Sequence, residues 1–203
     1  MNPVGILKNE HEKIILMLNV LDKMRGQFRE GARVDKEHLQ NMLRFFDIYY
    51  RQNHHNKEEL ILFPAFLSHT NPKRTGPIVE IMQNHHEEGN LYYSRFKYHV
   101  QKYCEDSDIW LPTLIDDFQT FAAFLRKHIL EEEKVLFPII NSHISPDMQK
   151  RLSQEFVKYE LEQVGIEKLN ELEYLAMGIA EYYLKLDLHK SVPKSVLAGS
   201  CPC

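Results

Sequence analysis

The sequence predicts an all-α protein, built as an antiparallel up-down four-helix bundle with an additional C-terminal helix. Apolar residues recur at spacings of three and four along long segments, which is helical rather than strand periodicity. The 8 glycines and 9 prolines are few and are interpreted as punctuation between those segments. Long amphipathic helices joined by short connections are what an antiparallel bundle requires.

The first two predicted helices each carry an apolar stripe that contains polar side chains. The first stripe is Leu7, His11, Ile14, Leu18 and Leu21, and the stretch REGARVD ends this helix. The second helix starts near Asp35, a suitable N-cap, and ends at HTNPKRTGP. Its stripe is Leu39, Leu43, Phe46, Tyr50, His54, Glu58 and Ile61. His54 and Glu58 therefore lie on the apolar face.

The remaining predicted helices complete the bundle and extend it. The third runs from Pro77 to about Tyr103, with the stripe Ile78, Met82, His86, Gly89, Tyr93, Phe96 and Val100. The fourth follows EDSD, with the stripe Leu114, Phe118, Phe121, Leu125, His128, Glu132 and Val135. Ser145 and Pro146 suit the N-cap and first position of a fifth helix with Leu152, Phe156, Tyr159 and Ile166 on one face. We expect a bundle over 1–144, a C-terminal helix packed on it over 145–186, and a flexible tail over 187–203.

An internal repeat carries the polar residues. HHNKEELILFP, residues 54–64, aligns without gaps on HILEEEKVLFP, residues 128–138, with six of eleven positions identical. The same offset of 74 residues brings His11 within one residue of His86, so the first and third helices also correspond. The chain is therefore interpreted as a duplicated helix pair, each pair with one histidine and then a histidine and a glutamate four residues apart.

This constellation indicates a metal site in the core. A histidine and a glutamate four residues apart share a helix face and can reach one ion. Burial of these groups without partners would cost on the order of several kcal/mol each, which a net stability of about 5–15 kcal/mol cannot carry. One such residue alone is more often a satisfied core histidine or a surface ion pair, but the fourfold pattern favours metal. The candidate ligands are His11, His54, Glu58, His86, His128 and Glu132.

The ligand types restrict the metal. Nitrogen and oxygen donors without thiolate favour iron, manganese or zinc over copper(I) or an iron–sulfur cluster. Two carboxylates shared among four histidines suggest two ions, each with two imidazoles, bridged by Glu58 and Glu132. His55 and Lys57 are expected on the wet or supporting side of their helix. The remaining glutamates are expected as solvated residues or as partners of the imidazoles: Glu59, Glu87, Glu131 and Glu133.

Composition and charge narrow the class of protein. The formal net charge is -4 at pH 7 and basic residues are dispersed among acids, so neither nucleic acid nor membrane is an expected partner. The N-terminus lacks a secretory pattern and no stretch reaches about 18 uninterrupted apolar residues, which predicts a soluble cytoplasmic protein. Cys104, Cys201 and Cys203 form no even disulfide framework, and the CPC ending is interpreted as incidental thiols at a frayed terminus.

The sequence resembles the haemerythrin-like, or HHE cation-binding, family. The likeness lies in NEHEK with His11, HHNKEELILFP with His54 and Glu58, GPIVEIMQNHHEEGN with His86, and KHILEEEKVLFP with His128 and Glu132. FVKYELEQVG also resembles the extra helix of bacterial and archaeal members. The resemblance implies a four-helix bundle around a non-haem di-iron centre. It places His11 and His54 on one iron and His86 and His128 on the other, with the two glutamates as bridges.

Two positions depart from the patterns of relatives. Oxygen-carrying haemerythrins have a further histidine one turn before the third-helix histidine, where this sequence has Met82. Some nitric-oxide-related and iron-repair relatives have a glutamate one turn after it, where this sequence has Asn90. The second iron is one ligand short of either pattern unless His85, Glu87 or solvent supplies it. This counts against reversible dioxygen carriage.

Three functions are compatible with these residues. The first is a di-iron protein that binds or senses dioxygen, nitric oxide or peroxide, or handles iron, with zinc or manganese as substitutes for the two Fe ions. The second is a di-iron oxidase, peroxidase-like or iron-centre repair enzyme, in which Tyr50 and Tyr93 donate electrons or protons. The third is a zinc-stabilised or metal-free helical interaction scaffold, which the repeated core carboxylates oppose. No catalytic residue is assigned, a redox partner protein is left open, and the oligomeric state is not predicted.

Overall fold

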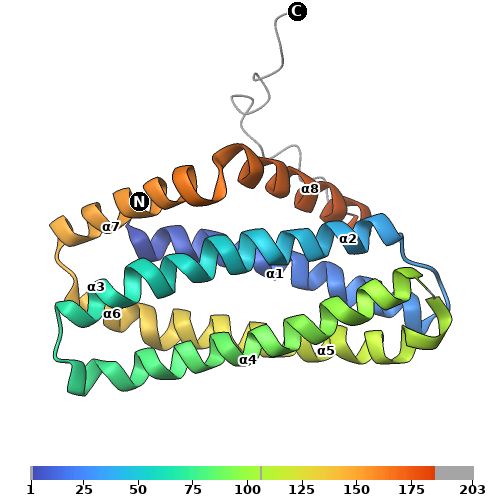
Figure 1. Cartoon of the computed structure of the whole chain (residues 1–203), viewed down its shortest axis with the longest axis horizontal. Coiled ribbons are helices and arrows are strands. Elements are labelled where there is room, and N and C mark those ends of the chain that lie inside the picture. Colours follow the sequence, from blue (N-terminus) through green and yellow to red (C-terminus); the bar gives the residue numbers. More distant parts are fainter. Residues whose placement is uncertain (1, 106, 186–203) are drawn as a thin grey trace, which may run out of the picture.

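A computed structural model describes residues 2–105 and 107–185, and all regular structure in them is helical (Figure 1). This confirms the predicted all-α class. The first part contains α1 (Pro3–Arg29), α2 (Lys36–Phe45), η1 (Phe46–His55), η2 (Glu58–Leu62) and α3 (Phe63–Ser68). The second contains α4 (Pro72–Glu105), α5 (Ser107–Glu131), η3 (Glu132–Leu136) and α6 (Phe137–His143). The last contains α7 (Pro146–Tyr159), η4 (Glu160–Val164) and α8 (Ile166–Leu184), and the η segments are π-helical.

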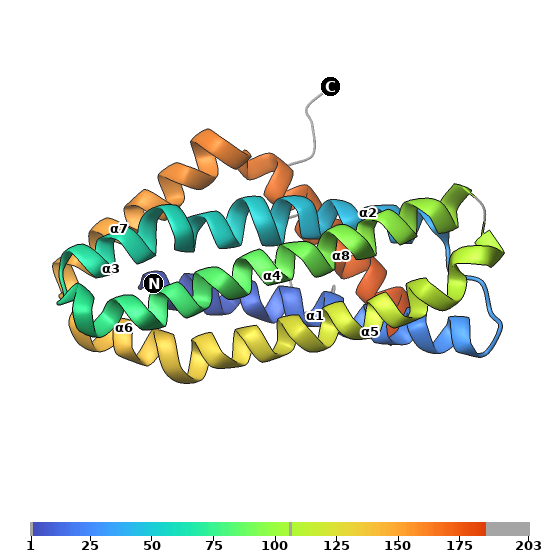
Figure 2. The ribbon, with the colours of Figure 1, turned by 60° about the horizontal axis from the view of Figure 1, so that its bottom comes forward.

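The long segments run side by side, and the chain reverses direction between them (Figures 1 and 2). α1 leads away from the N-terminus, α2 to α3 return as one rod, α4 leads back, and α5 to α6 return. α4 packs along α5, α1 packs against α5, and α2 packs against α4. α7 and α8 cover one side of this assembly, against α1 and the rod from α2 to η2. None of the described helices combines the length and apolarity needed to span a bilayer.

Local sequence signals set several helix ends. The side chains of Asp35 and Ser145 each accept a hydrogen bond from a backbone N–H in the first turn of the helix that follows, and Pro146 is at the start of α7. Both predicted N-caps are confirmed. α4 begins at Pro72, earlier than the predicted start at Pro77. Because Pro77 lies near the helix N-terminus, it removes one intrahelical hydrogen bond without ending the helix.

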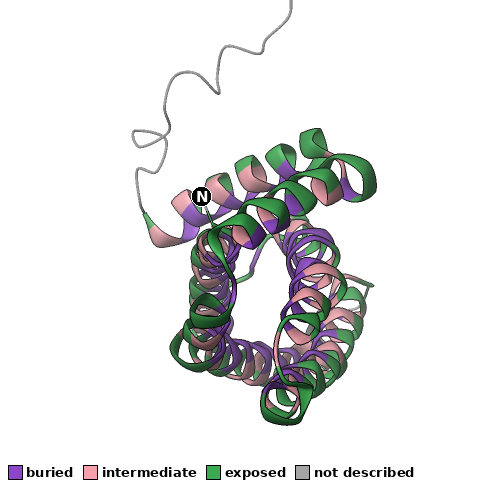
Figure 3. Ribbon diagram, turned by 90° about the vertical axis from the view of Figure 1, so that its left-hand side faces the viewer, coloured by how far each residue is buried: buried purple, intermediate pink, exposed green. Residues whose placement is uncertain are grey.

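The buried side chains form two hydrophobic clusters, one toward each end of the helical assembly. Figure 3 shows the buried residues facing the centre of the ring of helices. On α1, Leu7 belongs to one cluster and Ile14 to the other, and the buried His11 lies between them. The rod from α2 to α3, α4 and the rod from α5 to α6 likewise pass from one cluster to the other near their predicted histidines. A polar layer therefore separates the two apolar halves of the core.

The π-helical turns η2 and η3 occupy equivalent positions in the two repeats. Each precedes the proline of the LFP sequence, whose ring would clash with the carbonyl four residues earlier in a regular α-helix. A π-helical turn, with its i→i+5 hydrogen bonds, contains more residues than an α-helical turn. The residue that faces the core is therefore found at a later position in the sequence. Leu62 and Leu136 are fully buried, whereas Ile61 is only partly buried and Val135 is 45% exposed. The predicted core position of Val135 is therefore wrong, whereas Ile61 packs at the edge of the core.

The C-terminal segment is two helices rather than the one predicted over 145–186. Gly165, with a φ of 94°, ends η4 and separates α7 from α8. Glycine adopts this conformation readily because it has no Cβ. A single glycine in a helical pattern does not fix a boundary, so the sequence did not predict the break. The predicted tail, 187–203, with Cys201 and Cys203, lies outside the described residues.

Substitution of Gly165 should destabilise the protein. Gly165→Ala should cost about 1–2 kcal/mol, because a residue with a Cβ is strained at this positive φ. Gly178→Ala is the matched control on the exposed face of α8, where an added Cβ meets nothing within 4 Å, and it should stabilise by about 0.5–1 kcal/mol. Urea unfolding midpoints should move in opposite directions. Shifts of the same sign would show that Gly165 does not hold the break.

Candidate metal centre

Four side chains from four segments converge in the polar layer: His11 of α1, His54 of η1, Glu58 of η2 and Glu132 of η3. Their ligand atoms lie within 4.8 Å of one another, and all four are buried. His11 Nε2 is 3.0 Å from His54 Nε2 and 3.1 Å from Glu132 Oε2. The i, i+4 spacing brings His54 Nε2 and Glu58 Oε2 to 3.7 Å. These four residues are the first donor group.

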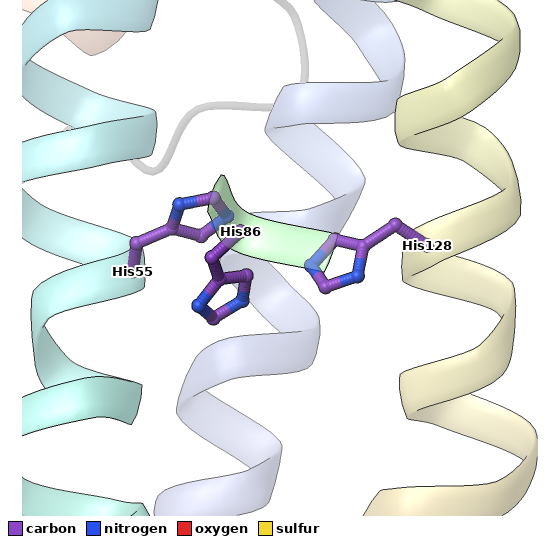
Figure 4. A group of neighbouring side chains, drawn as sticks. All are labelled: His55, His86 and His128. Atoms are coloured by element: carbon purple, nitrogen blue, oxygen red, sulfur yellow. The ribbon is translucent and has the colours of Figure 1, made fainter. Parts of the chain in front are cut away.

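A second donor group lies beside the first and consists of His55, His86 and His128 (Figure 4). Their ring nitrogens also approach within 4.8 Å, and all three side chains are buried. His86 Nε2 lies 3.4 Å from Glu58 Oε2 and 3.6 Å from Glu132 Oε1. His128 Nε2 lies 3.3 Å from Glu132 Oε1. The two carboxylates of the first donor group therefore also border the imidazoles of the second.

The structure thus brings the six residues selected from the sequence into one place, and His55 joins them. Many of their ligand atoms have no hydrogen-bond partner among the described residues. These atoms are both carboxylate oxygens of Glu58 and of Glu132, Nε2 of His55 and of His86, and both ring nitrogens of His128. Buried polar atoms are almost always paired, so this cluster needs a further partner. Carboxylate oxygens and imidazole nitrogens fit iron, manganese or zinc, and metal binding by these residues stays a prediction.

The charges of the cluster favour an added cation. Burial raises the pKa of Glu58, and the charge of Glu132 raises it further. Against its own burial, Glu132 has a pKa well below the ordinary value because His128 and two other histidines stabilise its charge. Burial lowers the pKa of His128 to about 3 and that of His55 well below its usual range. Burial opposes protonation of His11 too, but its close contacts with the carboxylates of Glu132 and Glu133 raise its pKa to about 9, so a metal would compete with a proton there.

Three glutamates hold imidazoles through the ring nitrogen that faces away from the cluster. The pairs are His11 Nδ1 to Glu133 Oε1 at 2.9 Å, His86 Nδ1 to Glu59 Oε1 at 2.6 Å, and His54 Nδ1 to Glu10 Oε2 at 2.9 Å. Such partners fix the orientation and tautomer of a ligating ring. The predicted roles of Glu59 and Glu133 as imidazole partners are confirmed. Glu10 was missed because it directly precedes His11, about 100° around the helix from the apolar stripe.

Lys57 and His55 are both buried, so neither lies on a wet side. Lys57 supports the cluster through Glu10, as one of the two predicted alternatives has it, whereas His55 itself joins the second donor group. Lys57 is fully buried, and its Nζ donates to Glu10 and, at 2.6 Å, to Glu160 of η4. Because α7 packs against η2 and η4 packs against η1, the side that carries Lys57 is not solvent-exposed. The side of a helix that faces the core spans an arc of at least about 100°. The π-helical turns of η1 widen this arc, so that both His54 and His55 face the core.

A surface cavity of about 570 Å³ reaches the second donor group. Its lining includes His55, His86, Glu59, Glu80 and Glu87. The two histidines are buried, whereas Glu80 and Glu87 are exposed, so the cavity extends from solvent to the side chains of these histidines. Its size admits a cation or a molecule of a few atoms.

The hydroxyl of Tyr50 is a further buried group without a hydrogen-bond partner in the described part of the chain. The Tyr50 ring packs against His55 with centroids 4.1 Å apart. Gly89 makes room for this contact, because a Cβ at that position would lie 3.4 Å from Tyr50 Oη and 3.0 Å from Phe124. Burial raises the pKa of Tyr50 well above its usual value, so the hydroxyl keeps its proton. Tyr93, in contrast, donates to a backbone carbonyl at 2.9 Å.

Comparison with protein families gives a match over most of the chain. A family model described as the hemerythrin HHE cation binding domain matches residues 2–140. This range contains all six predicted ligands and His55, and leaves α7 and α8 outside. No curated protein and no solved structure matches the chain significantly.

Removal of the Lys57 ammonium should lower the free energy of unfolding far more than removal of an exposed ammonium. Lys57→Met leaves the buried Glu10 without its cation and should destabilise the metal-free protein by about 3–5 kcal/mol. Lys13→Met is the control, because Lys13 is 41% exposed where it pairs with Glu173, and it should cost at most about 1 kcal/mol. Urea unfolding of the two variants measures the difference. Equal small losses would mean that Lys57 is solvated.

Proposed function

The chain belongs to the haemerythrin HHE cation-binding family, and from this premise we propose that it is a non-haem di-iron protein that binds or senses dioxygen, nitric oxide or peroxide, or handles iron. The proposed ligand is a small diatomic molecule or peroxide, and the proposed redox partner is a protein. Nucleic acid and membrane are not part of the proposal. The proposed location is the cytoplasm.

The proposed architecture is an up-down antiparallel four-helix bundle over residues 1–144 with residues 145–186 packed on it. Reversal of chain direction between α1, the rod from α2 to α3, α4, and the rod from α5 to α6 supports the bundle. Packing of α7 and α8 against α1 and the α2–η2 rod supports the added layer. In such bundles, metal ligands project inward from facing helices, which matches the polar layer between the two hydrophobic clusters.

The observation that carries the proposal is a pair of buried carboxylates, without hydrogen-bond partners among the described residues, between two groups of imidazoles. In the proposed centre, His11 and His54 hold one ion, His86 and His128 hold the other, and Glu58 and Glu132 bridge them. A bound iron pair supplies redox-active centres with coordination positions open to a small ligand. The protein supplies fixed rings, through Glu10, Glu59 and Glu133, and a core that excludes bulk water.

Iron is favoured over zinc by the way in which the donors are shared. A structural zinc ion is usually closed by four ligands of its own. Here both donor groups border the same two carboxylates, and neither group has cysteine. Manganese accepts similar donors, so manganese and zinc are substitutes that metal analysis must distinguish.

The cavity beside the second donor group supports exchange of a small ligand with solvent. Its lining reaches His55 and His86, while the first donor group is not part of that lining. A small ligand that enters there would come first to His55 and His86, which are proposed to hold the second ion. The size of the cavity agrees with a diatomic molecule, peroxide or an incoming cation.

The enzymatic alternative is a di-iron oxidase, peroxidase-like or iron-centre repair activity, and it is favoured by Tyr50. A protonated, buried hydroxyl without a partner in the described residues, packed on His55, can donate a hydrogen bond to a reacting group beside the second donor group. Tyr93 is less suited to this role because its hydroxyl is already used by a backbone carbonyl. Repeated oxidant consumption would distinguish the enzyme from a binder or sensor.

Metal analysis and a pair of neighbouring variants test the di-iron proposal. Protein from iron-replete cells should contain about two iron ions per chain, as a two-metal site requires. Glu58→Gln should lose the paired site because it removes a bridge. Glu59→Gln should retain two ions with affinity lower by about 10–100-fold, because Glu59 only orients His86. Stoichiometric zinc, or equal loss of iron in the two variants, would contradict the proposal.

Removal of the metal provides an independent readout. A ligand that binds only the folded state at 100 times its Kd stabilises that state by about 2.7 kcal/mol. A chelator should therefore lower the thermal midpoint of the wild-type chain, and it should change the midpoint of Glu58→Gln much less. An unchanged midpoint in the wild type would argue for a metal-free scaffold.

Tyr50→Phe tests the enzymatic alternative. If the protein turns over peroxide, loss of this hydrogen-bond donor should lower the rate per iron pair by about 100-fold or more. Tyr93→Phe is the control, and its rate should stay within about twofold because its hydroxyl serves the backbone. Iron content should be unchanged in both variants. Equal rates in wild type and Tyr50→Phe would exclude Tyr50 from the reaction.

A further inference from the structure

We propose that His55 is a ligand of the second metal ion, together with His86 and His128. This inference rests on the proposed di-iron function and adds a seventh ligand to the six named there. The second ion would then have three imidazoles and the first ion two, with Glu58 and Glu132 shared between them.

The rings of the second donor group are arranged around a common space. His55 stacks on His86 with centroids 3.8 Å apart and an interplanar angle of 21°, and it meets the ring of His128 at 5.7 Å and 90°. Figure 4 shows the three side chains reaching toward one another from three segments. Their ring nitrogens lie within 4.8 Å of one another. An ion at about 2.0–2.1 Å from each nitrogen spans about 4 Å, so small side-chain rotations would complete the site.

Two adjacent histidines of η1 face different donor groups. His54 faces His11, with their Nε2 atoms 3.0 Å apart, whereas His55 faces His86 and His128. The centroids of the two adjacent rings are 5.8 Å apart. One helical segment therefore presents an imidazole to each proposed metal position.

The internal repeat shows that the position of His55 belongs to the core in both copies. Ile129 aligns with His55, and it is buried in one of the two hydrophobic clusters. An apolar side chain fills such a position without any polar cost. His55 instead buries an Nε2 atom that has no hydrogen-bond partner among the described residues, which costs free energy. Coordination of an ion by this nitrogen would remove that cost.

The other residues that could complete the second ion are directed elsewhere. His85 Nδ1 lies 3.3 Å from Glu131 Oε2, and His85 is outside the second donor group. Glu87 is exposed at the surface. Asn90 accepts a hydrogen bond from Arg51 Nε at 2.7 Å. Of the residues near the cluster, His55 alone joins His86 and His128 within the described part of the chain.

A metal titration with matched variants tests this role. The metal-free full chain is titrated anaerobically with Co²⁺, whose visible absorption reports its coordination, and stoichiometry is measured by calorimetry. His55→Phe keeps a ring to stack on His86 but removes both nitrogens, and His85→Phe is the control. Wild type and His85→Phe should bind two Co²⁺. His55→Phe should bind one at wild-type affinity and the second more than about 100-fold more weakly, because loss of a supporting group alone costs about 10–100-fold.

The outcomes separate this inference from the di-iron proposal. Two ions bound to His55→Phe at wild-type affinities would overturn the role of His55 and leave the di-iron proposal standing. Fewer than two Co²⁺ in the wild type would overturn both. Far-ultraviolet circular dichroism checks the fold of each variant. If His55→Phe is not helical, His55→Ile, which carries the residue of the other repeat, is measured instead and interpreted in the same way.

Discussion

The burial of two carboxylates in the middle of an apolar core is the constraint on which the rest of the structure depends. Glu58 and Glu132 are 0% exposed, and none of their oxygens has a hydrogen-bond partner among the described residues. Two like charges so placed oppose folding unless positive charge lies between or beside them. The surrounding imidazoles reduce this opposition only in part. The two hydrophobic clusters on either side keep water out, which makes a cation the partner that best satisfies both carboxylates.

These carboxylates are placed in the core by the two equivalent π-helical turns of the duplicated backbone, η2 and η3. Each repeat has its histidine one turn before the glutamate, and a π-helical turn starts at that glutamate. The following LFP sequence then returns two large apolar side chains to the hydrophobic cluster that contains Leu7: Leu62 and Phe63 in one copy, and Leu136 and Phe137 in the other. The π-helical turn and the proline that follows it are therefore structurally linked, since the turn relieves the clash that the proline would cause in an α-helix.

The sequence was sufficient for the parts of the site that follow a regular period. His11, His54, His86 and His128 lie on stripes with spacings of three and four, so their convergence could be predicted from an α-helix of 3.6 residues per turn. The rest of the site depends on features that the α-helical period does not predict. His55 is buried because the inward arc of η1 is wider than one stripe, and Lys57 is buried because a separate layer packs over it. The break at Gly165 depends on a backbone conformation, which a residue pattern does not specify.

The two copies have equivalent backbone elements but differ in several of their side chains. Where the first copy has His55 and Lys57, the second has Ile129 and Glu131. His55 and Lys57 belong to the copy against which α7 and η4 pack. Glu160 of η4 contacts Lys57, Lys57 contacts Glu10, and Glu10 accepts the hydrogen bond of His54 Nδ1. The orientation of one candidate ligand therefore depends on a layer outside the matched family range, through a continuous chain of charged contacts.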